Sequence, residues 1–535
     1  MSAVISFADK KEKQERQEKQ EKIISYNPAT GEEIGAVAQT SAGEVLNAVE
    51  RARQAYKTWR GTSFSERAKY VLKTRDVILT EMDEIARLIS DESGKPVTEA
   101  FSAEIAPVTD LMRHFARNAA KILKPEKINI GQLGLLGRSS KIIYQPLGVV
   151  GIISPWNFPF SIPLGEVAMA LMAGNTVVLK PSELTPLVGI KIGEIFEKAS
   201  LPENVLQVIT GDGKTGAALV EAGVNKIMFT GSVATGKKIA ENAAKTLTPV
   251  VLELGGKDPM IVFADADLEA ASSAAIWGAF TNSGQACSSV ERLYVEESIA
   301  EKFTDLVVEK TRKLRQNLGN VETTDVGAMI SENQLKTVEN HVADFRQNGA
   351  KILTGGKRND DFRGTFFEPT VISGANNRMR AMREETFGPT LPIAVFKTES
   401  EAVELANDTD FGLTASIWTR DIKKGKRVAE KILAGTVMVN EVLYTHGIGQ
   451  TPWGGFKQSG YGRTHGKLGL LELVAPQHIH VNRVTILPNA WWFSYSDNAI
   501  ETFRGFARYF SSGSLFQTAR LAPQMLKRIR ELRRK

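Results

Sequence analysis

The single cysteine of the chain, Cys287, carries the side chain with the most distinctive chemistry. It lies in the stretch TNSGQACSSVERLYV, residues 281–295, among small residues and a glycine. A cysteine thiolate attacks carbonyl carbon well, but a free thiol becomes effective only when its environment lowers its pKa. The segment before Cys287 is typical of a helix end that runs into a glycine turn, which can hold a side chain at a cleft. A lone cysteine also serves as a small buried hydrophobe, so the surrounding sequence must decide between the two roles.

Two further residues offer chemistry that a cysteine nucleophile needs. Glu253 lies inside the apolar stretch VVLELGGKDP, residues 250–259, where desolvation should raise the pKa of its carboxyl and suit it to be a general base. A strand-end glutamate in a salt bridge fits that stretch equally well. Asn157 lies in the stiff, proline-flanked turn SPWNFPF, residues 154–160, where its amide can act as an oxyanion donor. Asparagine is also a common turn residue, so this signal alone decides nothing.

The elements that would position these residues alternate between strand and helix from about residue 140 onward. Segments such as NTVVLK and VNKIMFT are β-branched and apolar, and each is followed by a helical stretch. This alternation predicts an α/β fold with a parallel sheet, and ligands bind such sheets beyond the carboxyl ends of the strands. The turns PWNFP, KPSE, GDGKTG and TGSVATG therefore matter most. A second α/β block follows, with Cys287 between a helix and a strand.

Taken together, the motifs resemble the aldehyde dehydrogenase superfamily from about residue 25 to about residue 485. The motifs that carry the resemblance occur in the order of that family: PWNFP (155–159), KPSE (180–183), FTGSVATG (229–236), LELGG (252–256), GQAC (284–287), EETFGP (384–389) and PWGGFKQSG (452–460). Each is weak alone, and the ordered set is specific because every motif falls where the α/β pattern requires it. The resemblance implies a Rossmann-like cofactor domain, an α/β catalytic domain and a small β oligomerisation element.

The resemblance also implies the reaction, in which an aldehyde is oxidised to the carboxylic acid with NAD(P)+. Cys287 would be the nucleophile that gives a thiohemiacetal and then a thioester. Asn157 and the backbone N–H of Cys287 would form the oxyanion hole, and Glu253 would activate the water that hydrolyses the thioester. The substrate range is expected to be lipophilic or broad. A succinate-semialdehyde-like dehydrogenase and an acylating dehydrogenase, in which coenzyme A takes the thioester, are the alternatives.

Cofactor contacts follow from the same resemblance. Gly231 and Ser232 are expected to bring backbone N–H groups close to a pyrophosphate at a helix N-terminus. Glu183 is expected to bind ribose hydroxyls and so to favour NAD over NADP, while Lys180 and Ser182 leave NADP open. The full expected set is Ser154, Trp156, Lys180, Ser182, Glu183, Gly213, Gly216, Thr230, Gly231, Ser232, Gly236, Leu254, Glu385 and Phe387.

One position departs from the family pattern. Many members carry a lysine nine residues after the oxyanion asparagine, and this chain has Glu166 there. No role of that lysine in cofactor contact or proton transfer can be carried over. The nucleophile, base and donor remain complete, so we expect an active enzyme.

The composition argues against several kinds of site and partner. One cysteine excludes an internal disulfide and a cysteine-based zinc or iron–sulfur site, and no metal site is expected from the six histidines. The single cysteine fits a protein of the reducing cytoplasm. Association with a membrane surface is considered as well. The net charge is +6, and residues 491–535 alone carry +6, so the rest of the chain is neutral and no nucleic-acid partner is expected.

The expected organisation has five parts. We predict a charged N-terminal arm at 1–24, a cofactor-binding domain at 25–126 and 147–255, and a catalytic domain at 256–462. Segments 127–146 and 474–486 would pair as an oligomerisation element, which implies a homodimer or homotetramer because exposed edge strands need a partner. Residues 487–535 form an amphipathic, basic, aromatic tail. It is expected either to pack on a subunit or to lie on an anionic membrane surface.

Overall fold

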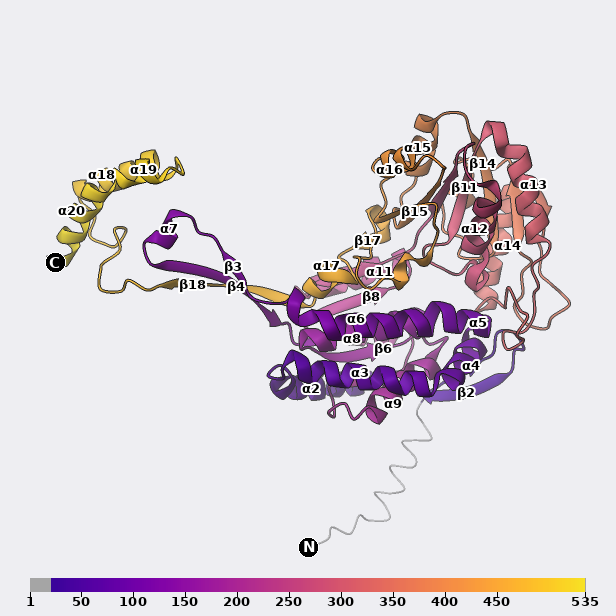
Figure 1. The fold of residues 1–535 in the computed structure, drawn as a ribbon. Helices are drawn as coiled ribbons and strands as arrows, with labels where there is room; N and C mark the ends of the chain where they lie inside the picture. Colours follow the sequence, from indigo (N-terminus) through magenta and orange to yellow (C-terminus); the bar gives the residue numbers. More distant parts are fainter. Residues whose placement is uncertain (1–20, 535) are drawn as a thin grey trace, which may run out of the picture. The chain divides into compact units, whose positions relative to one another are not determined.

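The computed structural model describes residues 21–534, so most of the expected arm at 1–24 lies outside the described residues. The chain forms two compact units. The main unit contains the residues up to Ile122 together with Pro146–Leu473, and the small unit contains Leu123–Gln145 together with the residues from Val474 onward. Each unit has its own sheets and helices (Figure 1).

The first sheet of the main unit has six strands in the order β17-β9-β8-β5-β6-β7. Its strands are β5 (Val149–Ile153), β6 (Thr176–Lys180), β7 (Leu206–Val208), β8 (Lys226–Thr230), β9 (Val250–Glu253) and β17 (Gly460–Tyr461). The five early strands run parallel, and β17 pairs antiparallel with β9 so that Gly460 lies opposite Glu253. The predicted catalytic domain ended at residue 462, whereas β17 shows that the chain has already returned to the first sheet.

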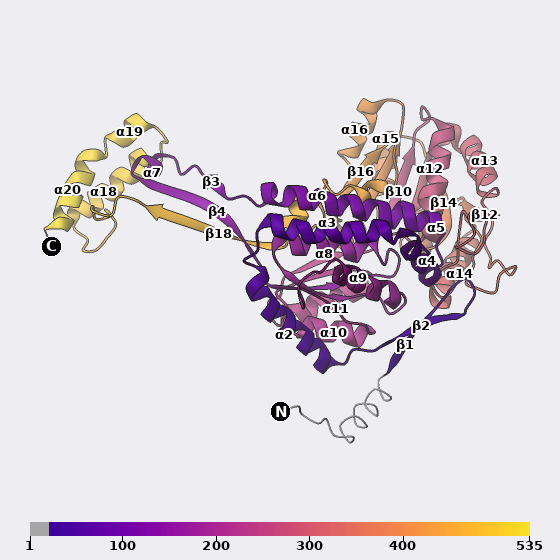
Figure 2. The same ribbon diagram turned by 60° about the horizontal axis from the view of Figure 1, so that its bottom comes forward.

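Helices cover this sheet on both faces, as the predicted alternation requires (Figure 2). One face packs against α2 (Ala42–Trp59), α10 (Gly213–Glu221) and α11 (Val233–Ala244), whose buried side chains form one cluster with those of β5, β6 and β8. Helix α8 (Ser161–Ala173) is buried throughout its length and is backed by α6 (Ala106–Ile122) and α3 (Phe64–Thr80). The remaining elements here are β1 (Lys22–Tyr26), β2 (Glu33–Ala38), α4 (Met82–Ser93), α5 (Val97–Glu99) and α9 (Pro186–Lys198).

The second sheet of the main unit has seven strands in the order β12-β13-β14-β11-β10-β15-β16. They are β10 (Asp258–Val262), β11 (Val290–Glu296), β12 (Lys351–Thr354), β13 (Thr370–Ser373), β14 (Thr390–Phe396), β15 (Thr414–Trp418) and β16 (Thr436–Val439). Only the β12–β13 pair is antiparallel. Side chains alternate between the two faces, so that Met260 and Val262 join one core cluster and Ile261 joins the other.

The helices of this sheet follow the same division. Helices α12 (Leu268–Phe280) and α13 (Ala300–Thr311) belong to one core cluster, and α15 (Glu399–Asn407) and α16 (Ile422–Ala429) belong to the other. Two further helices are α14 (Glu332–Gln347) and α17 (Gly466–Leu471). Because both faces are covered, strands such as β10 and β15 are buried along their whole length, as parallel strands usually are.

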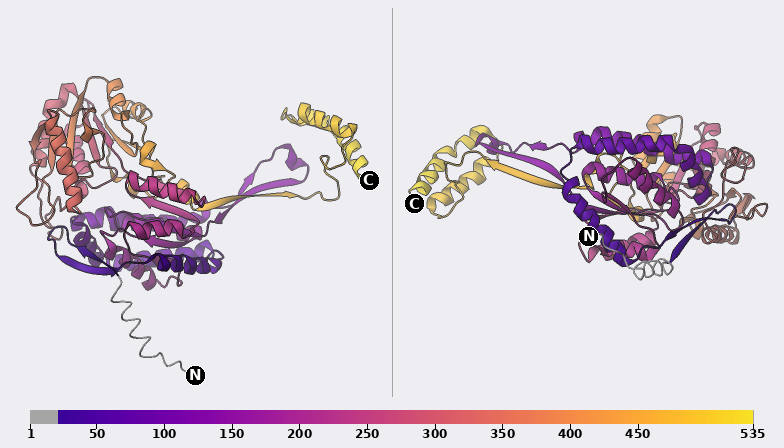
Figure 3. Two further views of the ribbon diagram at one scale, coloured as in Figure 1. Left: turned by 180° about the vertical axis from the view of Figure 1, so that it is seen from behind. Right: turned by 90° about the horizontal axis from the view of Figure 1, so that it is seen from below.

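The small unit begins with a three-stranded sheet in the order β18-β4-β3. Strand β3 (Glu126–Ile128) pairs antiparallel with β4 (Arg138–Pro146), and β18 (Val474–Asn482) lies along the other side of β4 (Figure 3). The short helix α7 (Gln132–Leu135) joins β3 to β4. Strand β18 comes from the late segment that the sequence paired with residues 127–146.

The C-terminal tail folds into three helices: α18 (Asp497–Gly505), α19 (Leu515–Ala519) and α20 (Ala522–Arg533). Arg528 of α20 is fully buried and donates to the backbone carbonyls of Ala490, Trp492 and Ser494. The Arg528 side chain therefore holds the backbone of the aromatic stretch before α18 in place. Across residues 21–534, no helix is both long and apolar enough to cross a membrane.

Candidate active site

Cys287 follows a tight turn at the end of α12. The turn at Thr281–Gly284 places Asn282 and Ser283 at positive φ, 53° and 55°, which is uncommon for residues other than glycine. Glu99 accepts the backbone N–H of Asn282, and the Asn282 side chain donates to the carbonyl of Gln285 at 3.1 Å. These bonds fix the backbone immediately before the nucleophile.

Asn157 is held on the other side of the same turn. Its side-chain amide donates to the carbonyl of Gln285 at 3.1 Å, and its own carbonyl accepts from Lys95 Nζ at 2.7 Å. Lys95 forms a fully buried ion pair with Glu104 at 2.6 Å. Glu104 in turn accepts the backbone N–H of Ser161 at the start of α8. The buried Lys95–Glu104 ion pair thus holds the backbone of Asn157, whose side-chain amide is expected in the oxyanion hole. Neither Lys95 nor Glu104 lies in one of the sequence motifs.

Glu253 ends β9 with both carboxylate oxygens buried and without a hydrogen-bond partner. A Cβ added at Gly454, whose φ is +144°, would lie 2.8 Å from Glu253 Oε1, so glycine at this position leaves room for the carboxylate. Burial, and secondly the neighbouring Glu166 carboxyl, raise the pKa of Glu253 well above its ordinary value. A buried carboxyl without partners is suited to take a proton near neutral pH, as the sequence predicted.

Two large cavities open on Cys287. The first, of about 220 Å³, is named here the cleft, and Asn157, Glu253, Glu385 and Phe387 line it together with Cys287. The second, of about 280 Å³, is named the tunnel. Its apolar lining is supplied by Phe158, Ile162, Trp277, Leu443 and Tyr444. The thiol is therefore reached from two directions, through the cleft with the larger share of polar surface and through the more apolar tunnel.

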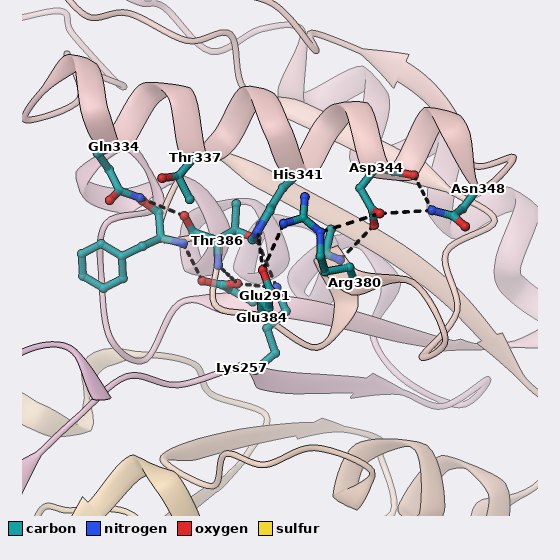
Figure 4. Close-up of polar contacts among 12 residues, drawn as sticks. Lys257, Glu291, Gln334, Thr337, His341, Asp344, Asn348, Arg380, Glu384 and Thr386 are labelled. Carbon is teal, nitrogen blue, oxygen red and sulfur yellow. Dashed lines mark hydrogen bonds and ion pairs between the residues drawn. The ribbon is translucent and has the colours of Figure 1, made fainter. Parts of the chain in front are cut away.

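A buried ion pair also shapes the loop that carries Glu385 and Phe387 (Figure 4). Glu291 accepts from Lys257 Nζ at 2.5 Å and from the backbone N–H groups of Thr386 and Phe387. Phe387 has a φ of +52°, a strained value that these bonds support, and its ring meets Trp156 edge-on at 5.3 Å. The loop therefore presents its side chains to the cleft in a fixed arrangement.

Helix α14 contacts the same loop from outside (Figure 4). Gln334 donates to the carbonyls of Thr386 and Phe387 at 2.9 and 3.0 Å, and His341 Nδ1 lies 3.0 Å from Thr386 Oγ1. Gln334 and Thr337 also line the cleft. The sequence analysis missed both residues because α14 carries no motif, and only their spacing on one helix face could have indicated them.

The glycine turn after β8 is tied to the neighbouring strand. The N–H of Gly231 donates to the carbonyl of Glu253 at 3.0 Å, and the expected contact of Gly231 with a pyrophosphate stays a prediction. A Cβ at Gly231 would lie 2.6 Å from the Phe229 ring, and a Cβ at Gly236 would lie 2.6 Å from Leu254, so both glycines serve packing. Ser232 caps α11 by accepting the N–H of Thr235, and Thr230, Gly231, Ser232 and Leu254 all line the cleft.

The KPSE turn brings the expected ribose contacts together. Lys180 ends β6 and its Nζ lies 3.0 Å from Glu183 Oε2, with the lysine buried and the glutamate half-exposed. Ser182 is buried and accepts the N–H of Leu184, while Ser154 is buried with its hydroxyl unpartnered. A carboxylate and an ammonium at the end of a strand suit ribose hydroxyls, so this turn fits the expected dinucleotide.

The GDGKTG turn leaves open space beside its glycines. A Cβ at Gly213 or Gly216 would meet no atom within 4 Å, and Asp212 caps the start of α10. Neither glycine is needed for packing within the protein. Their assignment to the cofactor therefore rests on the family resemblance alone.

The surroundings of Cys287 favour its protonated form. Burial raises the pKa of the Cys287 thiol, and the neighbouring carboxyls of Asp258, Glu385 and Glu253 raise it further. A base must therefore take the thiol proton before attack, and Glu253 lines the same cleft with both oxygens unpartnered. In residues 21–534 no three His, Cys, Asp or Glu side chains are grouped as metal ligands.

Comparisons with known proteins show which family the chain resembles. The model of the aldehyde dehydrogenase family matches residues 15–479. The chain is 39% identical over 510 residues to a 4,4'-diapolycopene aldehyde oxidase of Methylomonas sp, which covers 95% of each chain. It is 39% identical to a putative NADP+-dependent succinate-semialdehyde dehydrogenase of Mycolicibacterium smegmatis, over 85% of this chain and 88% of that protein. A solved structure of Staphylococcus aureus betaine aldehyde dehydrogenase with NAD+ superposes with a TM-score of 0.83 and 35% identity, covering 92% of this chain and 98% of that one.

Proposed function

The chain belongs to the aldehyde dehydrogenase family and oxidises aldehydes to carboxylic acids with NAD(P)+, and we propose that Cys287, Glu253 and Asn157 carry out the reaction. The observation that supports this assignment is the meeting of the cleft and the tunnel at Cys287, with Glu253 and Asn157 both on the cleft wall. One opening suits a cofactor and the other a substrate.

The proposed mechanism begins with loss of the Cys287 proton to Glu253, which releases this proton to solvent before the hydrolysis step. The thiolate attacks the aldehyde carbon, and the resulting oxyanion is stabilised by the Asn157 amide and the backbone N–H of Cys287. Bound NAD(P)+ supplies the hydride acceptor. Loss of hydride from the former aldehyde carbon leaves a thioester on Cys287. Glu253 then takes a proton from water, the hydroxide attacks the thioester, and the acid departs as Cys287 is released.

For the cofactor, we assign the ribose contact to Lys180 and Glu183 and the nicotinamide side to Glu385 and Phe387. Glu183 would repel a 2′-phosphate, so NAD is the expected preference. We assign residues 25–126 and 147–255 to the cofactor domain, and 256–462 to the catalytic domain except for strand β17.

For the substrate, we propose a neutral, lipophilic aldehyde. The tunnel walls are mainly apolar and aromatic, and no Lys or Arg occurs among the described residues that line it. Glu99 also lines the tunnel, and its ionised form would repel an anion there. This argues against a semialdehyde that carries a second carboxylate.

Two observations separate the alternatives further. The relative named as a 4,4'-diapolycopene aldehyde oxidase aligns over 95% of this chain, whereas the semialdehyde relative aligns over 85%. Glu253 at the cleft favours water over coenzyme A as the group that takes the thioester, because a general base is needed to activate water.

A substrate panel tests the proposal on purified enzyme. We expect kcat/KM for decanal to exceed that for succinic semialdehyde by at least about tenfold, since an apolar tunnel gains from each buried methylene. Betaine aldehyde and acetaldehyde serve as cationic and short comparisons. A higher kcat/KM for succinic semialdehyde than for decanal would overturn the substrate proposal and leave the reaction class intact.

We also propose that the protein is a homo-oligomer. Strand β18 is an edge of its three-stranded sheet, and residues 475–478 on it are exposed. An edge strand of this length needs a partner to satisfy its backbone. Light scattering at micromolar concentration should give the mass of a dimer or a tetramer, and a monomer mass would refute the proposal.

For the tail, we propose contact with an anionic membrane surface. The aromatic side chains Trp492, Phe493 and Phe516 are at least half exposed, and the segment holds the net positive charge of the chain. Aromatic rings at the headgroup level with basic residues beside them are typical of peripheral membrane segments.

Vesicle binding tests the tail in the full-length protein. Vesicles with phosphatidylglycerol should retain the enzyme, and a Phe493→Ser, Phe516→Ser double variant should lose most of this binding. Leu247→Ser, at a residue 90% exposed in the main unit, is the matched control and should bind as the wild type does. Equal binding by all three proteins, or none by the wild type, would refute membrane contact through the tail.

A further inference from the structure

A third, small cavity lies behind the catalytic groups. Its volume is about 20 Å³, enough for one water molecule. Cys287, Glu253 and Glu166 line it together with Thr230, His446 and His465. It therefore joins the proposed base to a buried carboxyl that the mechanism above does not use.

Glu166 enters this cavity from the buried helix α8. Only 3% of the residue is exposed; its Oε1 accepts from Thr230 Oγ1 at 3.4 Å, and its Oε2 has no partner. Glu253 is 5% exposed and has two unpartnered oxygens. Buried carboxyl oxygens need hydrogen bonds, and a water between the two groups would supply them.

The charges around the cavity allow only one of these carboxyls to ionise. Arg463 is the one cationic side chain that acts on Glu253 among the described residues. The histidines do not add positive charge, because burial lowers the pKa of His446 to about 4 and that of His465 well below its ordinary value. With one shared proton, Glu166 and Glu253 together carry one negative charge, which the positive charge of Arg463 offsets. If both carboxyls were ionised, one buried negative charge would have no partner.

We propose that Glu166 and Glu253 share one proton through a single water in this cavity, and that Glu166 takes the proton whose departure makes Glu253 a base. The transfer is balanced: protonated Glu253 gives its proton to the water, and the water gives a proton to the Glu166 carboxylate. The ionised Glu253 then accepts a proton from the water that attacks the thioester. One proton leaves to solvent through the cleft at the end of the cycle. Glu166 acts through Glu253, so it is a positioning residue.

The inference rests on the proposed role of Glu253. It predicts how the rate of thioester hydrolysis depends on pH. Burial raises the pKa of Glu166 to about 8, and Glu166 is the second cause of the raised pKa of Glu253. Two coupled carboxyls titrate as a pair, so removing one charge lowers the pKa of the other. The groups that face the pair are Thr230, Cys287, His446, Thr464, His465 and Arg463.

The experiment measures thioester hydrolysis alone, with a p-nitrophenyl ester that acylates Cys287 without hydride transfer. The hydrolysis rate should rise with pH as Glu253 ionises. In Glu166→Gln the midpoint of that rise should fall by about one pH unit. Full ionisation of Glu253 in the wild type requires loss of the shared proton and leaves Glu253 beside an ionised Glu166, whereas the amide stays neutral. Glu166→Lys, a second variant that places a cation there, should move the midpoint at least as far in the same direction.

Glu92→Gln is the matched control. Glu92 is equally buried, and burial raises its pKa to about 7, but it bonds Ser25 and the start of α9 rather than this cavity. Its variant should keep the wild-type midpoint. A midpoint in Glu166→Gln that is unchanged or higher, or an equal shift in Glu92→Gln, would overturn the proposal.

Failure of the proposed function would look different. Glu253→Gln should slow hydrolysis by about 10²-fold and remove its rise with pH, and a wild-type rate with the wild-type rise in that variant would refute the base assignment. A purely structural role of Glu166 would lower the rate at every pH and leave the midpoint in place, which also counts against the inference.

Discussion

The cleft and the tunnel meet at the same thiol and differ in how they are built. The cleft side is held by buried ion pairs and backbone hydrogen bonds, with Lys95–Glu104 behind Asn157 and Lys257–Glu291 behind the loop at Phe387. The tunnel is lined mainly by packed apolar side chains that make few hydrogen bonds to one another. Chemistry needs polar groups at fixed positions, whereas selection among aldehydes needs a shape and an absence of charge.

This difference predicts how each wall responds to change. A substitution in the cleft should affect all aldehydes alike, because every substrate passes through the same intermediates. A substitution in the tunnel should change the ratio between substrates and leave the chemistry in place. The following predictions use that contrast.

The largest effect is expected from Cys287→Ser. Loss of the nucleophile should lower kcat by about four orders of magnitude or more for every aldehyde, while cofactor binding and the folded structure persist. Steady-state turnover and cofactor fluorescence titration measure the two properties. Because Cys287 is the only cysteine, one equivalent of a thiol reagent should inactivate the wild type. Wild-type turnover in the serine variant would exclude the assigned nucleophile.

A smaller loss, of about 10²-fold in the steady state, is expected from Glu253→Gln. Thioester hydrolysis should become the slow step, because solvent or buffer can still take the Cys287 proton in this variant. Rapid mixing with NAD+ and decanal should then show a burst of NADH followed by a slow phase. A slow first turnover without a burst would indicate instead that Glu253 acts mainly on the thiol.

In the tunnel, Tyr444→Arg should change the ratio of substrates. A cation on this wall should raise kcat/KM for succinic semialdehyde relative to decanal by about tenfold, through attraction of the second carboxylate. Tyr444→Gln, a neutral control, should leave the ratio near that of the wild type. Equal ratios in the arginine and glutamine variants would mean that Tyr444 does not face the bound substrate.

The smallest effect is expected at the edge of the cofactor site. Glu183→Ser should raise the ratio of NADP to NAD use several-fold, because it removes a charge that would face a 2′-phosphate. Glu197→Ser on the exposed side of α9 is the matched control and should leave the ratio unchanged. An unchanged ratio in Glu183→Ser would remove that residue from the ribose contact.

The same contrast explains what the sequence could predict. Four residues that line the cleft lie in short motifs, and the motifs PWNFP, LELGG, GQAC and EETFGP predicted Asn157, Glu253, Cys287 and Phe387 as site residues. The α/β fold followed from the alternation of apolar strands and helices. Both signals are local, and local signals are visible in one sequence.

The residues that the sequence did not indicate act through distant partners. Lys95 contacts Asn157 across 62 positions, and Glu291 contacts Phe387 across 96, so no spacing connects them. Gly231 was assigned to the cofactor because a glycine after a strand suits a pyrophosphate. In the structure its N–H donates to the carbonyl of Glu253 and the neighbouring Phe229 ring explains the glycine, while the pyrophosphate contact stays a prediction. Tunnel residues such as Trp277 and Leu443 have the same apolar character as core residues, and only the fold separates them.

The most direct test of the central claim is the mass of the trapped intermediate. Glu253→Gln is mixed with NAD+ and decanal, quenched in acid during the slow phase, and digested for mass spectrometry. A decanoyl group should be found on the peptide that contains Cys287, and the Cys287→Ser, Glu253→Gln double variant should carry none. A decanoyl group on another residue, or its presence in the double variant, would contradict the account.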